Sequence, residues 1–153
     1  MTVSIVASQY NSEFTDALVE NAREELAELT TNTNIELIRV PGAFEIPVTI
    51  EALIRKSQPK CIIALGLIIR GQTAHGDLVA DSVTQALQNI AVQHATPIIH
   101  EVLLVDDEKQ AYARCIGSKL NRGREAAQAA ISMIETFQQI APSTASRAYP
   151  SNA

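Results

Sequence analysis

The chain has 153 residues, the size of one ordinary domain. Hydrophobic residues make up 46% of it and charged residues 19%, proportions that argue against a disordered or fibrous protein. The formal net charge of −5 gives no globally basic field of the kind that attracts nucleic acid. No apolar run reaches the roughly 18 residues of a membrane-spanning helix, and the first residues lack the basic and apolar regions of a signal peptide. We therefore expect a cytoplasmic protein with neither a nucleic-acid nor a membrane partner.

The first half of the chain predicts two strands and two helices, at 3–7, 12–30, 35–40 and about 44–56. Ser12 is the expected N-cap of the first helix. The apolar face of that helix recurs at spacings of four and three, through Phe14, Leu18, Ala22, Leu26 and Leu29. Pro47 is expected in the first turn of the second helix, where its missing N–H costs little.

The second half continues with a strand, a helix, a strand and two helices, at 61–69, 77–93, 97–105, 108–114 and about 123–140. The run 61–69 is the most apolar and should be central in the sheet. Residues 142–153 are small and polar, without periodicity, so we expect one domain over 1–141 and a disordered tail. Four parallel strands with helices on both faces predict a three-layer α/β sandwich of the flavodoxin-like type.

Ligands of such folds bind beyond the carboxyl ends of the strands, which directs attention to the loops that follow them. The loop after the third strand is the richest in chemistry. Gly71 permits close backbone approach, Thr73 offers a hydroxyl, and the helix that follows presents free N–H groups, so the loop could hold a phosphate. Arg70, or an arginine from another loop, would supply the counter-charge. An ordinary strand-to-helix turn is the alternative.

Several side chains near these loops allow two interpretations each. His75 could move a proton near neutral pH or could be an idle surface residue. Tyr10 and Phe44 could stack on a planar ligand or could be packing aromatics. His94 is expected to be a solvated residue at a helix end, whereas His100 lies mid-strand, where an apolar residue is usual. A basic cluster could recruit phosphate or simply be solvated, and it comprises Arg114, Lys119, Arg122 and Arg124.

Three stretches of the chain resemble the signature stretches of the lumazine synthase family. They are VPGAFEIP at 40–47, ALGLIIRGQTAHGDLVADSV at 64–83, and Arg114 followed by NRGREAA at 121–127. The resemblance extends from about residue 3 to 140 in the same order. It implies a transferase of riboflavin biosynthesis that condenses 5-amino-6-(D-ribitylamino)uracil with 3,4-dihydroxy-2-butanone 4-phosphate and needs no metal or organic cofactor.

The resemblance also implies residue roles. His75 would be the proton donor and acceptor. The pyrimidine and the ribityl chain would be held by Tyr10, Ala43, Phe44, Glu45, Leu67, Ile68, Ile69 and His100. The phosphate would be held by Gln72, Thr73 and, from a neighbouring subunit, Arg114. Arg122 and Glu125 would support this region, with a His–Glu contact. Because the site is shared, a homo-oligomer based on a pentamer is expected, either a free pentamer or a pair of pentamers.

The chain departs from the family pattern at three places. His100 stands where the family commonly has Phe, Gly76 replaces an aromatic after the histidine, and 103–112 lacks the usual threonines. These differences bear on substrate affinity more than on reaction class. Two other functions remain open at this point. The same pocket could carry flavin or lumazine without catalysis, and a flavodoxin-like electron carrier is disfavoured because a Ser/Thr-rich phosphate loop is missing after the first strand.

Overall fold

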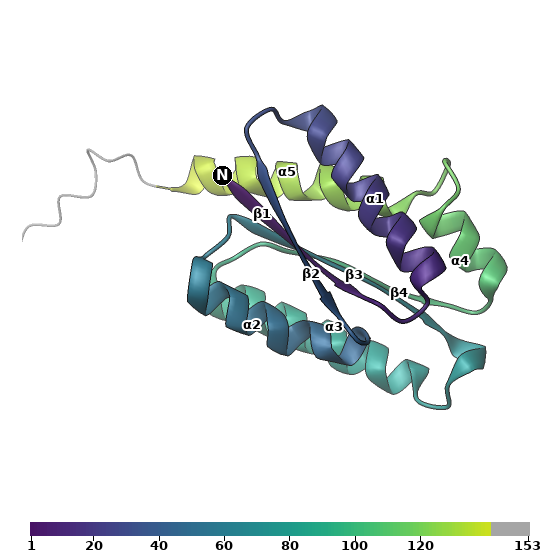
Figure 1. Ribbon diagram of the computed structural model, residues 1–153. Coiled ribbons are helices and arrows are strands. Elements are labelled where there is room, and N and C mark those ends of the chain that lie inside the picture. Colours follow the sequence, from purple (N-terminus) through teal and green to yellow (C-terminus); the bar gives the residue numbers. More distant parts are fainter. Residues whose placement is uncertain (142–153) are drawn as a thin grey trace, which may run out of the picture.

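A four-stranded parallel sheet forms the centre of the computed structural model, which describes residues 1–141 (Figure 1). The strands are β1 (Thr2–Ser8), β2 (Asn34–Val40), β3 (Cys61–Ile69) and β4 (Ile98–Val105). Their order is β2-β1-β3-β4, and every neighbouring pair is parallel. β3 lies between β1 and β4 and is buried along its whole length, which confirms its predicted central place. The expected disordered tail, residues 142–153, lies outside the described residues.

Helices cover both faces of the sheet, which confirms the predicted three-layer flavodoxin-like sandwich (Figure 1). α1 (Ser12–Leu29), α4 (Glu108–Cys115) and α5 (Arg122–Ile140) contribute to the apolar core on one face. α2 (Ile46–Ser57) and α3 (Gly76–His94) contribute to the core on the other. Strand residues that alternate along the chain supply the two cores in turn, as the pleat of a sheet requires.

The start of α1 differs from the prediction. Its N-cap is Asn11, not Ser12, and Asn11 has left-handed backbone dihedrals with φ 61°. Asn tolerates this conformation better than most residues do. The Asn11 side chain makes no capping bond, and its Nδ2 instead donates a 3.1 Å hydrogen bond to the carbonyl of Leu67 on β3. The end of the helix also differs, because Leu29 is 44% exposed and does not join the core.

The segment after β2 begins with a 3-10 turn, η1 (Ala43–Glu45), so α2 starts at Ile46, slightly later than predicted. Pro47 lies in the first turn of α2, as expected. The Glu45 carboxylate accepts a 3.1 Å hydrogen bond from the amide of Gly42. This bond closes the turn and holds η1 at the carboxyl end of the sheet.

α5 begins with a close approach to α1. The Asn121 side chain caps the helix by accepting a 3.0 Å hydrogen bond from the amide of Arg124. At Gly123 a Cβ atom would lie only 2.6 Å from the carbonyl oxygen of Leu18 on α1. Glycine is therefore required at this position by the distance between two helix backbones.

Candidate active site

A cavity of about 430 Å³ opens at the carboxyl ends of the strands. Its walls come from the loop after β1, from η1, from the end of β3 and from the turn that leads into α3. Nine of the predicted site residues line this cavity: Tyr10, Ala43, Phe44, Glu45, Leu67, Ile68, Ile69, Gln72 and Thr73. Segments more than sixty residues apart in the chain thus meet at one rim, as parallel strands dictate.

Two aromatic rings stand at the mouth of this cavity. Tyr10 is 61% exposed and Phe44 is 63% exposed, so neither ring is a packing residue of the core. The amide of Tyr10 donates a 3.1 Å hydrogen bond to the carbonyl of Pro41, which joins the loop after β1 to the segment that leads into η1. The backbone is therefore held while the ring faces remain available to stack on a planar ligand.

The turn after β3 suits an anion. It consists of η2 (Arg70–Gln72) and Thr73, whose Oγ1 accepts a 3.2 Å hydrogen bond from the amide of His75. The hydroxyl hydrogen of Thr73 is thereby directed away from that amide. α3 begins at Gly76, directly after His75, and no side chain caps its first turn. The first backbone amides of α3 can therefore bind a ligand, and the helix dipole favours negative charge there.

Arg70 is already engaged by two carboxylates. Its Nε donates to Asp77 Oδ1 at 3.1 Å, and its Nη1 donates to Asp106 Oδ1. These carboxylates raise the pKa of Arg70, and Arg70 in turn lowers the pKa of Asp106. Because its charge is compensated, Arg70 is not the uncommitted counter-charge that a phosphate in this turn would need.

His75, Arg114 and His100 are not among the residues that line the cavity of their own chain. His75 is exposed at the start of α3, between Thr73 and Gly76, which both line the cavity. Arg114 lies in the last turn of α4, and its charge contributes to the lowered pKa of Asp106. His100 lies on β4 beside a separate hollow of about 190 Å³ that Thr84 also lines. Arg114 and His100 would need a second protomer, or a different conformation, to contact a ligand in the cavity.

The hydrogen bonds of His100 define its tautomer. The amide of Val102 donates to Nδ1 at 3.1 Å, so Nδ1 carries no proton. Nε2 therefore carries the hydrogen of the neutral ring and donates to Thr84 Oγ1 at 2.7 Å. Partial burial lowers the pKa of His100, which is consistent with a neutral imidazole.

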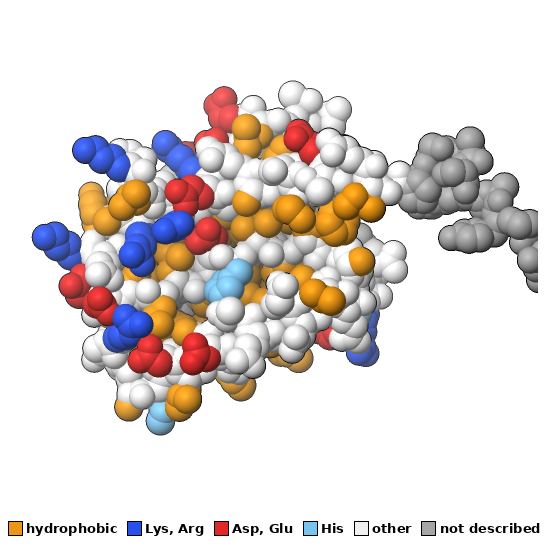
Figure 2. All heavy atoms as spheres, turned by 180° about the vertical axis from the view of Figure 1, so that it is seen from behind, with side chains coloured by type: hydrophobic (Ala, Val, Ile, Leu, Met, Phe, Trp, Pro, Cys, Tyr) orange, Lys and Arg blue, Asp and Glu red, His pale blue; other side chains and the backbone are white. Residues whose placement is uncertain are grey.

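Arg122 and Glu125 pair with each other at the start of α5, with 2.9 Å between Arg122 Nη1 and Glu125 Oε2. Within residues 1–141 of a single chain, no hydrogen bond or ion pair joins Glu125 to His75. Arg122 and Glu125 therefore lie beside one another, and the predicted contact between Glu125 and His75 is not made within the described part of one chain. Figure 2 shows that Lys and Arg side chains, interleaved with acidic ones, gather toward one end of this side of the molecule.

Glu101 was not singled out from the sequence, although an acidic residue inside an apolar strand was a usable signal. It lies on β4 and is half-buried. Burial raises its pKa to about 7, an effect that Arg122 opposes and Glu125 reinforces. Glu101 therefore opposes folding most strongly when it is ionised.

Glu101→Gln should raise the free energy of unfolding at pH 8, and this gain should shrink as the pH falls from about 7 toward 4.5. The folded-state pKa lies above the ordinary pKa of 4.5 for a glutamate, so wild-type stability declines as the pH rises through this window. Solvent screening of a partly exposed group reduces the gain to about 1–2 kcal/mol. Urea unfolding of both proteins across this pH range measures it, and a gain that is the same at pH 5 and pH 8 would contradict the assignment.

Both cysteines are poor nucleophiles. Burial raises the pKa of the Cys61 and Cys115 thiols to about 12, so neither forms a thiolate near neutral pH.

In the described part of the chain, no group of three or more His, Cys, Asp or Glu residues is arranged to hold a metal ion. In the same part, no helix is both long enough and apolar enough to cross a membrane.

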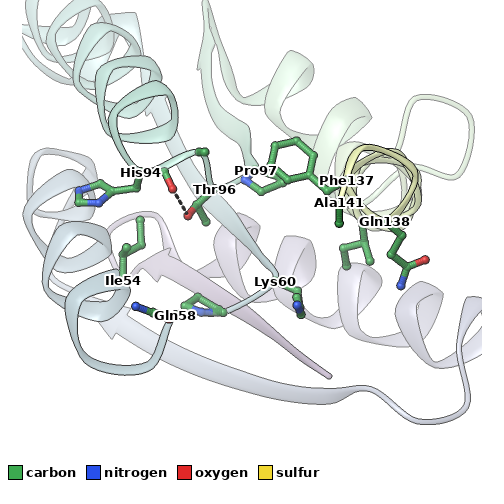
Figure 3. A pocket seen from close by; sticks show the side chains of 12 residues that line it. Ile54, Gln58, Lys60, His94, Thr96, Pro97, Phe137, Gln138 and Ala141 are labelled. Atoms are coloured by element: carbon green, nitrogen blue, oxygen red, sulfur yellow. Dashed lines mark hydrogen bonds between the residues drawn. The ribbon is translucent and has the colours of Figure 1, made fainter. Parts of the chain in front are cut away.

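A second cavity of about 440 Å³ lies where the strands begin, at the opposite edge of the sheet (Figure 3). Lys60, Thr96 and Phe137 are among its lining residues, and none of the residues selected for the site lies there. His94 borders it but is not the solvated residue that we expected. Its side chain is 21% exposed and its Nε2 lies 2.5 Å from Glu51 Oε2 on α2.

Comparison with known proteins points to one family. The sequence profile described as "6,7-dimethyl-8-ribityllumazine synthase" matches residues 1–138. A protein of that name from Xanthomonas oryzae pv. oryzae (strain PXO99A) is 40% identical over 136 residues, covering 88% of each chain. Another from Stenotrophomonas maltophilia (strain R551-3) is 38% identical over 138 residues, covering 90% of this chain and 89% of that one.

Among solved structures, one titled "Crystal Structure of TesA" superposes with a TM-score of 0.44 at 9% identity, covering 90% of this chain and 99% of that one. That similarity is too low to support any conclusion. The sequence match is different in kind, because it spans nearly all the described residues and includes every wall of the cavity. The chain therefore belongs to the 6,7-dimethyl-8-ribityllumazine synthase family, a family of transferase enzymes.

Proposed function

We propose that this protein is a 6,7-dimethyl-8-ribityllumazine synthase of riboflavin biosynthesis. It condenses 5-amino-6-(D-ribitylamino)uracil with 3,4-dihydroxy-2-butanone 4-phosphate and releases one phosphate and two waters. The observation that carries the proposal is that one cavity is lined both by the exposed aromatic residues Tyr10 and Phe44 and by the turn at Thr73, which suits an anion. A planar heterocycle and a phosphorylated sugar fragment would meet there.

The pyrimidine would stack on Tyr10 and contact the backbone of 67–69 at the end of β3. The Leu67 carbonyl already accepts a hydrogen bond from the side-chain amide of Asn11. The neighbouring residues Ile68 and Ile69 are therefore better placed to offer backbone groups to the ring. The ribityl hydroxyls would bind along η1, where Glu45 provides a carboxylate that is exposed and bonded to the Gly42 amide. These contacts orient one reactant toward the start of α3.

The phosphate would bind in the turn after β3. Gln72 supplies an amide side chain, Thr73 supplies a hydroxyl, and the first amides of α3 supply unbonded N–H groups. Since Arg70 is held by two carboxylates, a further cation is needed to balance the anion. Arg114 from a neighbouring protomer would supply it.

The chemistry is a sequence of proton transfers at held reactants. The 5-amino group of the uracil attacks the ketone, and water leaves to form an imine. Phosphate is eliminated next, the ribitylamino nitrogen closes the ring, and a second water departs. His75 would donate and accept the protons, while much of the acceleration comes from holding the two reactants together. No protein nucleophile and no cofactor is needed for these steps.

A homo-oligomer, built on a pentamer, is part of the proposal. Beside the cavity, an apolar hollow of about 430 Å³ lies between η1, α2 and α3, and Pro47, Val48 and Val83 line part of it. Val48 is 69% exposed, as is Leu78 in the first turn of α3. Exposed apolar surface next to an incomplete anion site is what a neighbouring protomer would cover.

Mixing the purified protein with both substrates and following lumazine absorbance tests the proposed function. We expect the protein to form lumazine well above the spontaneous rate. His75→Ala should lower kcat by roughly 10-fold, because proton transfer is lost while proximity remains.

His94→Ala is the matched control, since His94 lies at the opposite edge of the sheet, and it should leave kcat unchanged. If the wild type gives only the spontaneous rate but binds the lumazine product, the protein is a carrier and the proposal fails.

A further inference from the structure

An ion-pair bridge joins three segments around the turn after β3, which comprises residues 70–75. Arg70 lies in η2, Asp77 lies in the first turn of α3, and Asp106 directly follows β4. Asp106 is fixed from its other side, because its amide donates to Gln110 Oε1 at 2.8 Å and its Oδ2 accepts from Gln110 Nε2 at 3.3 Å. One guanidinium therefore ties the turn to α3 and, through Asp106, to the start of α4.

The residues between the two ends of this bridge are those assigned to phosphate binding and proton transfer. Arg70 precedes Gln72 and Thr73 in the chain, and Asp77 follows His75. Apart from the bridge, the turn is held by the hydrogen bond from the His75 amide to Thr73. The Gly76 backbone also passes close to Ile68, whose side chain would lie 3.2 Å from a Cβ atom at Gly76. Every residue from Arg70 to His75 is exposed, so core packing does not fix its position.

We propose that Arg70 is a positioning residue of the condensation, which acts by bridging Asp77 and Asp106 so that the turn carrying Gln72, Thr73 and His75 keeps the geometry the phosphorylated substrate requires. This inference rests on the proposed function. Arginine suits the role because its planar fork can bond two carboxylates at once, which a lysine ammonium does less well. Arg70 need not touch the substrate.

Steady-state kinetics with each substrate varied in turn tests the inference. Arg70→Ala should lower kcat and raise the KM for the phosphorylated substrate, with about a 10-fold combined loss in kcat/KM, since misplacements near 1 Å can cost up to about 100-fold. The KM for the uracil should stay constant, because its contacts lie on the other walls. Arg70→Lys should recover part of the loss.

The effect of Asp106→Asn distinguishes positioning from direct contact. If Arg70 positions the turn, Asp106→Asn lowers kcat as Arg70→Ala does, and the double variant is no worse than Arg70→Ala alone. If Arg70 instead binds the phosphate, removing a competing carboxylate lowers the KM for the phosphorylated substrate, and the inference is overturned.

Arg55→Ala is the matched control, because Arg55 is an exposed arginine with a single carboxylate partner, Glu51, on α2. It should leave both kinetic constants unchanged. Melting temperature and oligomeric mass of each variant are measured in parallel, so that a fall in activity from unfolding is identified. An active wild type with an unaffected Arg70→Ala variant overturns the inference alone, whereas an inactive wild type overturns the proposed function.

Discussion

Arg114→Ala should raise the KM for 3,4-dihydroxy-2-butanone 4-phosphate by about 100-fold while leaving the KM for the uracil nearly constant. Removing one charged partner of a desolvated ion pair costs about 2–5 kcal/mol, and each 1.4 kcal/mol is tenfold in affinity. The proposed function needs this arginine for its phosphate, because Arg70 is already neutralised by Asp77 and Asp106.

Arg124→Ala is the control for this experiment. Arg124 carries the same charge, lies in the first turn of α5 and is exposed. Its loss should change the kinetics by less than about twofold at physiological salt, where exposed charges are screened. An unchanged KM in Arg114→Ala would remove this residue from the site.

Subunit complementation shows whether Arg114 acts in its own chain or in the next one. When the Arg114→Ala and His75→Ala chains are refolded together, about one quarter of shared sites in a cyclic oligomer receive both intact residues. The mixture should then be several-fold more active than the two proteins assembled separately. No gain would mean that each site draws on one chain, provided that light scattering shows mixed assemblies of pentameric mass or a multiple of it.

Gly123→Ala should lower the free energy of unfolding by about 2 kcal/mol and the melting temperature by about 5 °C. The new methyl group would meet the Leu18 carbonyl at 2.6 Å and Asn21 Cβ at 3.0 Å, so α1 and α5 would have to move apart. This cost outweighs the gain in helix propensity of about 1 kcal/mol that alanine brings over glycine.

Gly71→Ala provides the matched comparison. Gly71 has no positive φ, and a Cβ there would meet no atom within 4 Å. Its stability should stay within about 0.5 kcal/mol of wild type. Thermal unfolding followed by circular dichroism separates the two variants, and equal melting temperatures would show that the α1–α5 contact relaxes freely.

The layer order and most helix and strand positions could be predicted because they depend on local periodicity. The run 61–69 reads as a central strand from its composition alone, and the loops after parallel strands must share one edge. The start of α1 could not be predicted in this way, because Asn11 bonds a carbonyl that lies 56 residues away in the chain. Local capping preference favours Ser12, and the tertiary contact overrides it.

The residues assigned to the site divide along the same line. Most of those at or after the ends of strands line the cavity, whereas His75, His100 and Arg114 are not among its lining residues in a single chain. The double engagement of Arg70 depends on Asp106, which is 36 residues away. The raised pKa of Glu101 depends on how α5 packs over β4. Such effects arise from tertiary distances, which a periodic pattern does not contain.

β4 lies at an edge of the sheet. Among the described strands it pairs with β3 alone, so its outer backbone groups form an open border of the sheet. A long apolar strand with such a border can recruit a strand from another molecule and seed aggregation. His100 and Glu101 place a polar and an ionisable side chain in the middle of this strand, on opposite faces. Both side chains oppose edge-to-edge association of separate chains along this strand, because a strand added there would have to bury or pair them.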